Sequence, residues 1–124
     1  MRRHLDPVVR QARDAIEARL EREGFRLQDE HLYHDAAFGS ATFEYRHRAK
    51  WLRLEWDGKD RHLWLVGAVS KDQHVLPSQD LWHPLEDPSN NPAAMSLRSG
   101  PAADARVAAL LDQIELFLAS CSAV

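Results

Sequence analysis

Hydrophobic residues recur three or four positions apart near the start of the chain, a period that predicts an amphipathic helix. The apolar stripe of this helix comprises Leu5, Val8, Val9, Ala12, Ile16 and Leu20. Asp6 is suited to cap the helix, and Pro7 to fill its first position. Gly24 is suited to the left-handed conformation that ends a helix, after which Phe25 packs back on the last turn.

The same period returns near the end of the chain and predicts a second helix, from about residue 102 to about residue 121. Pro101 stands near the start of this helix. Its wide apolar face comprises Val107, Leu110, Leu111, Ile114, Phe117, Leu118 and Cys121. Because Cys121 is the only cysteine, the chain has no internal disulfide framework and no cysteine-rich zinc site.

Between the helices the period shortens to two, which is typical of strands. Residues 41–47 and 51–56 alternate clearly, and residues 62–69 are apolar on both faces, as in a central strand. Residues 25–28 and 32–38 are candidates for short strands, with a poorer period. The connections are too short for helical crossovers, so the sheet is predicted to be antiparallel.

Turn and loop signals complete the predicted fold. Residues 57–60 are predicted to form a turn, in which Gly58 is free to take a positive φ. Residues 75–101 are punctuated by proline, with Leu81 and Trp82 anchoring them to the body and a helical turn at 93–97. We therefore predict a single α+β domain over residues 1–124. It has an N-terminal helix, an antiparallel sheet of three to five strands, a long Pro-rich loop and a C-terminal helix, with both helices on one sheet face.

Composition narrows the function classes without choosing one. The chain has 124 residues, a hydrophobic fraction of 44% and a charged fraction of 28%, as in ordinary globular proteins. The net charge of −3 argues against a dedicated binder of duplex nucleic acid. The N-terminus lacks the apolar core of a signal peptide, and no segment has the ~20 apolar residues of a membrane span, so we expect a cytoplasmic protein with no membrane partner.

No spacing of reactive side chains points to catalysis. The seven histidines include no metal-binding motif, and His31 and His34 point to opposite faces if their segment is a strand. The chain has no nucleophile elbow and no phosphate-binding loop. Glu44 and Glu55 are expected on one sheet face near Arg46 and Arg53, where a cross-strand charge ladder accounts for them. We therefore predict no catalytic residue, no metal, no cofactor and no enzymatic activity.

The segment 45–53 contains four permanently charged cations, two aromatic rings and no acidic residue. The predicted partner-binding residues are Tyr45, Arg46, Arg48, Lys50, Trp51 and Arg53 on this hairpin and Trp64 on the next strand. Three interpretations remain open: an exposed hairpin protected by charge against aggregation, a contact for an anionic protein, and a site for single-stranded nucleic acid. The overall charge makes nucleic acid unlikely.

Several short segments resemble a recurring pattern in small bacterial proteins. They are Phe38-Gly39-Ser40, then Trp51-Leu52-Arg53-Leu54-Glu55-Trp56-Asp57-Gly58-Lys59-Asp60, then Leu63-Trp64-Leu65 and Asp80-Leu81-Trp82. The pattern is similar to mostly uncharacterised proteins, some of which are immunity proteins that neutralise polymorphic toxins. The resemblance covers the central half of the chain and implies a partner-binding module; no functional residue carries over from it.

The leading hypothesis is a non-catalytic protein-binding module of the immunity or inhibitor kind, acting through an open sheet face. The first alternative is a small-ligand or enzyme pocket between loop 75–101 and the sheet, lined by Trp82, His83 and His74. The second is a single-stranded nucleic-acid binder that uses hairpin 45–53. A homodimer through the open sheet face is also consistent with the pattern.

Overall fold

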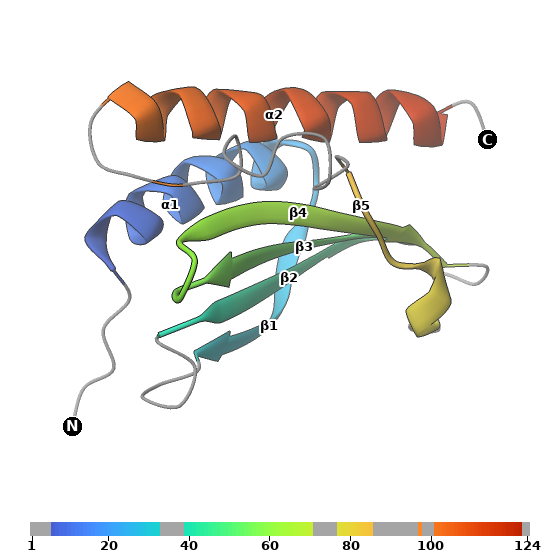
Figure 1. The fold of residues 1–124 in the computed structure, drawn as a ribbon. Coiled ribbons are helices and arrows are strands. Elements are labelled where there is room, and N and C mark those ends of the chain that lie inside the picture. The colour runs from blue at the N-terminus through green and yellow to red at the C-terminus, as the bar shows by residue number, and fades with distance from the viewer. Residues whose placement is uncertain (1–5, 33–38, 71–76, 86–96, 98–100, 123–124) are drawn as a thin grey trace.

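The computed structural model describes residues 6–32, 39–70, 77–85, 97 and 101–122 (Figure 1). The elements in order are α1 (Pro7–Arg22), β1 (Arg26–Leu32), β2 (Ala41–His47), β3 (Lys50–Asp57), β4 (His62–Val69), the 3-10 turn η2 (Gln79–Leu81), β5 (His83–Pro84) and α2 (Pro101–Ser122). The strands form one antiparallel sheet in the order β1-β2-β3-β4-β5. The predicted α+β class is confirmed, with five strands.

The two ends of α1 are formed as predicted. An Asp6 carboxylate oxygen accepts a hydrogen bond from the Val8 backbone N–H at 2.8 Å, which caps the helix. Gly24 has a φ of 95° and ends it. The Phe25 N–H donates to the Leu20 carbonyl at 2.9 Å, so the chain turns back and buries the Phe25 ring against the last turn.

Both helices cover the same face of the sheet and run side by side in the same direction (Figure 1). An ion pair of 2.8 Å between Arg19 and Glu115 joins their C-terminal halves. The core between helices and sheet is made of Val9, Ala12, Ile16, Leu20, Phe25, Ala41, Phe43, Tyr45, Leu52, Leu54, Trp56, Leu63, Leu65, Leu97, Leu110, Ile114 and Phe117. No helix in the described part of the chain is long and apolar enough to span a membrane.

The first strand differs from its prediction. One strand, Arg26–Leu32, extends beyond the predicted end of the strand at 25–28, and the strand predicted at 32–38 lies outside the described residues except for Leu32. The register with β2 shifts between Leu27 and Asp29. This bulge adds a residue to one strand and reverses the alternation beyond it, which is why the sequence showed a poor period there.

Two turns place arginine where the left-handed conformation is needed. After β3, Arg61 has a φ of 56°, and Gly58 is not among the positive-φ residues of the described chain, so the turn does not use the freedom of this glycine. Asp57 organises this turn instead, because its carboxylate accepts from the N–H groups of Lys59 and Asp60. Between β2 and β3, Arg48 has a φ of 58°.

Residues 77–85 form a short segment across the sheet, which we call the strap. His83 and Pro84 pair with Gly67 and Val66 of β4. Trp82 anchors the strap to the sheet, as the sequence predicted, by lying over Arg53. The helical turn predicted at 93–97 lies outside the described residues except for Leu97, which is buried.

Gly67 allows α2 and the strap to approach the sheet. A Cβ atom built on Gly67 would lie 2.8 Å from the Phe117 ring and 3.0 Å from a Leu85 methyl carbon. These distances are shorter than van der Waals contact. The missing side chain is therefore a packing requirement of the core.

We expect Gly67→Ala to lower the free energy of unfolding by about 1–3 kcal/mol, because the new methyl group displaces Phe117 and Leu85. Urea denaturation measures the effect. Phe117→Leu shortens the opposing side chain, so the double variant should lose less stability than the sum of the two single variants. Strict additivity would show that the two residues do not compete for this space.

Candidate partner-binding surface

The sheet face turned away from the helices, the outer face, carries every second residue of the strands. These residues are Arg26, Asp29 and His31 on β1, Thr42, Glu44 and Arg46 on β2, Trp51, Arg53 and Glu55 on β3, and Trp64, Val66 and Ala68 on β4. Arg53 lies opposite Glu44, with a nitrogen–oxygen distance of 3.3 Å, and 3.5 Å from a Glu55 oxygen. The predicted charge ladder is confirmed for Arg53, whereas Arg46 forms no ion pair in the described part of the chain.

The strap covers the β3–β4 part of the outer face. The Arg53 guanidinium lies 4.5 Å from the centre of the Trp82 ring, and the rings of Trp51 and Trp82 meet edge to face at 6.3 Å. Trp51 is only 4% exposed, and Val66 and Ala68 beside it are buried. The expectation that this face lies open is therefore wrong at its centre.

Tyr45 is not on the outer face. It shares the alternation of Ala41 and Phe43, so its ring lies in the core beneath the helices with 0% exposure. Burial raises the pKa of its hydroxyl, and the negative charge of Glu17 raises this pKa further. In this structure Tyr45 has no surface with which to touch a partner.

Three arginines at the end of the outer face nearest the β2–β3 turn form what we call the basic cluster: Arg26, Arg46 and Arg48. Arg26 and Arg46 stand directly opposite each other on β1 and β2. The Arg46 Nε–H donates to the Arg48 carbonyl at 2.8 Å, and its guanidinium lies 5.4 Å from the centre of the Trp51 ring. Among the described residues, none of the three forms an ion pair.

Lys50 and Trp64 lie apart from this cluster. By alternation along β3, Lys50 points to the helix side of the sheet. There its charge lowers the pKa of Cys121, against the larger effect of burial, which raises that pKa. Trp64 is half-buried on the outer face opposite Glu55, away from the β2–β3 turn.

Side chains satisfy single outward-facing backbone groups on β4 and on β1. On β4, the buried Arg106 donates from Nε and Nη2 to the Leu63 carbonyl at 2.9 and 2.6 Å. On β1, the Asp29 carboxylate accepts from the Glu30 N–H at 2.9 Å. Such contacts satisfy backbone groups that would otherwise pair with another strand.

The histidines among the described residues do not form a cluster. His31 contacts Asp29 at 2.9 Å on the exposed part of β1, and His83 is exposed on the strap. His34 and His74 lie outside the described residues. Within the described ranges, no group of three histidine, cysteine or acidic residues is arranged to hold a metal ion.

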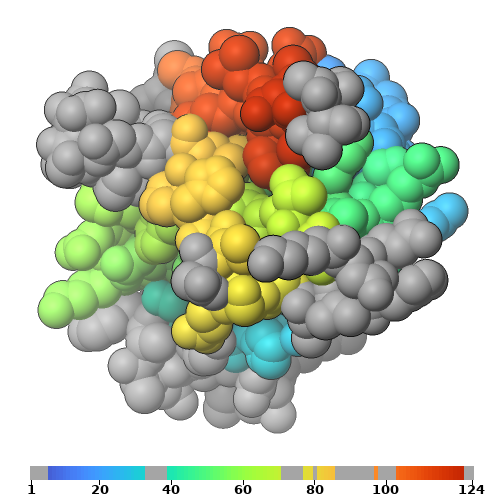
Figure 2. Space-filling model, turned by 90° about the vertical axis from the view of Figure 1, so that its right-hand side faces the viewer, coloured from blue at the N-terminus to red at the C-terminus, as the bar shows by residue number. Residues whose placement is uncertain are grey.

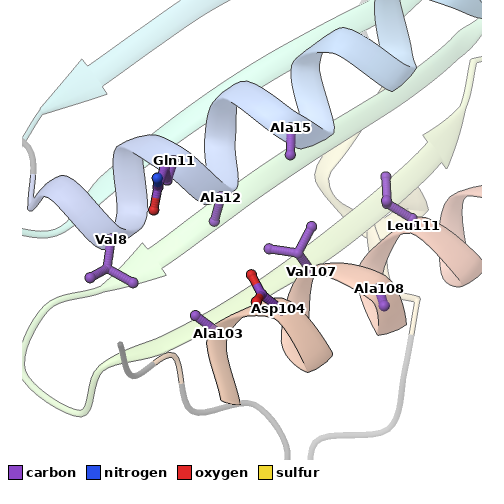
Figure 3. A pocket seen from close by; sticks show the side chains of 9 residues that line it. All are labelled: Val8, Gln11, Ala12, Ala15, Ala103, Asp104, Val107, Ala108 and Leu111. Carbon is purple, nitrogen blue, oxygen red and sulfur yellow. The ribbon is translucent and has the colours of Figure 1, made fainter. Parts of the chain in front are cut away.

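A groove of about 370 Å³ lies between the N-terminal halves of the two helices (Figure 3). Its lining is mostly small and apolar, with one amide and one carboxylate: Val8, Gln11, Ala12, Ala15, Ala103, Asp104, Val107, Ala108 and Leu111. This groove is far in the fold from the pocket expected beside Trp82 and His83. Trp82 is instead packed on Arg53 and Trp51.

Two features of the surface were missed from the sequence. Arg26 was left out of the predicted site because the sequence does not give the register in which its predicted strand at 25–28 pairs with β2. The cover over Trp51 was missed because Trp82 follows it by 31 positions, through a stretch with no period to place it. The turn signal at Gly24 does mark Arg26 as the start of a strand, and this was the available clue.

Comparison with protein-family models, with curated proteins and with solved structures gave no match. The resemblance to immunity proteins therefore stays a prediction.

The predicted site residues differ in burial, so their substitutions should differ in their effect on the free energy of unfolding. We expect Trp51→Ala to cost about 3–5 kcal/mol of unfolding free energy, because it empties the space beneath Trp82. Arg48→Ala should cost about 0.5 kcal/mol or less, because the side chain is exposed. Thermal and urea unfolding compare the two. Equal, small losses would mean that Trp51 is not packed as described.

Proposed function

We propose that this protein is a non-catalytic binding module, of the immunity or inhibitor kind, whose basic cluster contacts an acidic surface of a protein partner. The observation that carries the proposal is the direct opposition of Arg26 and Arg46 without a carboxylate between them. Like charges placed opposite each other on neighbouring strands destabilise a sheet, by roughly 0.2–1 kcal/mol. A partner's carboxylate between the two guanidinium groups turns this repulsion into attraction.

The Arg46 side chain of the basic cluster is also preorganised for binding. The bond from Arg46 to the Arg48 carbonyl and the Trp51 ring beneath it restrict the guanidinium before any partner arrives. Less side-chain entropy is then lost on association. Arg48 keeps a φ of 58°, where a non-glycine residue pays a strain of about 1 kcal/mol or more. An arginine retained in such a turn is consistent with a use for its exposed side chain.

The structure favours a protein over single-stranded nucleic acid as the partner. Stacking on bases requires exposed rings, and the two rings of the hairpin, Tyr45 and Trp51, are both buried. What the hairpin offers to solvent is charge. Local positive charge can steer an acidic protein to this cluster without any exposed aromatic ring.

We expect the double variant Arg26→Ala/Arg48→Ala to bind its partner at least about tenfold more weakly than the wild type. The tagged protein serves as bait in a lysate of the cells that produce it. Captured proteins are identified by mass spectrometry, and the affinity of the recovered partner is then measured for each variant.

The matched control is Arg10→Ala/Arg22→Ala, which removes the same charge from exposed positions of α1 that also lack ion pairs in the described structure. This control should bind like the wild type. Equal losses in both double variants would indicate a response to net charge, and capture that survives removal of Arg26 and Arg48 would refute the proposed surface.

The nucleic-acid alternative has its own measurement. We expect titration with single-stranded oligonucleotides at about 50 and 200 mM salt to leave the tryptophan fluorescence unchanged, because no hairpin ring is free to stack. A saturable signal that weakens at the higher salt concentration would favour nucleic acid as the ligand of the basic cluster.

A further inference from the structure

The strap is held on β4 by few backbone contacts. β4 has eight residues, but β5 pairs with only Val66 and Gly67, and one of its two residues is a proline, which has no N–H to donate. One more bond, from the Leu85 N–H to the Leu65 carbonyl at 3.0 Å, follows. Figure 2 shows the strap lying at the surface against α2 and the end of β4.

The side chains of the strap make the contacts that a bound peptide makes in a groove. Trp82 lays its ring over Arg53 on the outer face, and three residues later Leu85 packs beside Phe117 on the helix side of Gly67, so the two anchors grip β4 from opposite faces. Between them, His83 and Pro84 run extended along β4 with both side chains exposed. Main-chain pairing together with two side-chain anchors is the usual pattern of peptide recognition by a sheet edge.

Beneath the strap one polar group is left unsatisfied. Trp51 is only 4% exposed, and its indole Nε1–H has no hydrogen-bond acceptor in the described part of the protein. A buried donor without an acceptor costs about 1–3 kcal/mol. Native structures rarely leave such a group without a reason. The Trp82 ring of the strap contacts the Trp51 ring, but no described group accepts from Trp51 Nε1.

From these contacts we infer that the strap is an internal stand-in for an extended peptide of another protein. The peptide takes the strap's place on β4, with an aromatic side chain on Arg53 and an aliphatic one, three residues later, on the helix side of Gly67. One of its backbone carbonyls accepts from Trp51 Nε1. This site is separate from the basic cluster and does not depend on it.

The side chain of the ligand that lies over Arg53 is uncharged. Arg53 already has carboxylate oxygens of Glu44 and Glu55 at 3.3 and 3.5 Å. A further carboxylate would be repelled by both, whereas an aromatic ring and a backbone carbonyl carry no net charge. The strap itself uses an indole at this position.

The covalent attachment of the strap makes it a strong competitor. A tethered segment acts at an effective concentration of about 1 mM or more. A free peptide with the same intrinsic affinity for the site therefore binds the wild type poorly. Trp82→Ala removes the larger of the two anchors and leaves the site less occupied.

The probe is a synthetic peptide of residues 79–85, Gln-Asp-Leu-Trp-His-Pro-Leu. In calorimetric titrations we expect it to bind Trp82→Ala at least about tenfold more tightly than the wild type. In NMR spectra of Trp82→Ala, the Trp51 indole N–H resonance should shift as the peptide is added. Leu85→Ala, which weakens the other anchor, should change the affinity in the same direction.

Two controls define the result. The same peptide with alanine in place of its tryptophan should bind neither protein, and Leu116→Ala, which shortens an exposed apolar side chain of α2, should behave like the wild type. Equal affinity of the peptide for the wild type, Trp82→Ala and Leu85→Ala, or no binding to either folded variant, would overturn the inference. Arg26→Ala/Arg48→Ala should bind the peptide unchanged, so that failure here and failure of the basic cluster are told apart.

Discussion

The alternation of side chains along β2, β3 and β4 is the constraint from which the rest of this structure follows. Two helices cover one face of the sheet, so every second residue of these strands is committed to the core. A shift of one residue in register would bury Arg53 and expose Leu52 and Leu54. The same constraint places the charged side chains of these strands together on the outer face, because the helices cover the other face.

The outer face is divided between two kinds of contact. Near the β2–β3 turn, the guanidinium groups of the basic cluster have no acidic neighbours among the described residues. Toward β4, the Trp82 indole of the strap is stacked on the Arg53 guanidinium. Trp51 links the two parts, since Arg46 lies over one side of it and Trp82 meets its edge. The first part suits an acidic surface, and the second suits an extended chain with an uncharged side chain over Arg53.

The backbone groups that side chains satisfy on β4 and β1 bear on how a partner can approach. Arg106 satisfies a carbonyl of β4 from within the core, and Asp29 satisfies an N–H of β1 from the surface. Strand addition is thereby discouraged along β1 and along the first half of β4. Only the second half of β4, where the two-residue β5 lies, is held by an element short enough to be exchanged.

The sequence by itself determined the elements whose signals are local. Asp6, Pro7 and Gly24 bound α1, and the alternation from Ala41 to Trp56 gave both the β2–β3 pair and the charge ladder of Glu44, Glu55 and Arg53. The same alternation places Tyr45 with Ala41 and Phe43 on the core face. Only the tertiary structure decided that Trp51 is buried and that Arg26 joins Arg46. Those outcomes depend on contacts between segments far apart in the chain and on a bulge that reverses the alternation, and neither leaves a period to be read in advance.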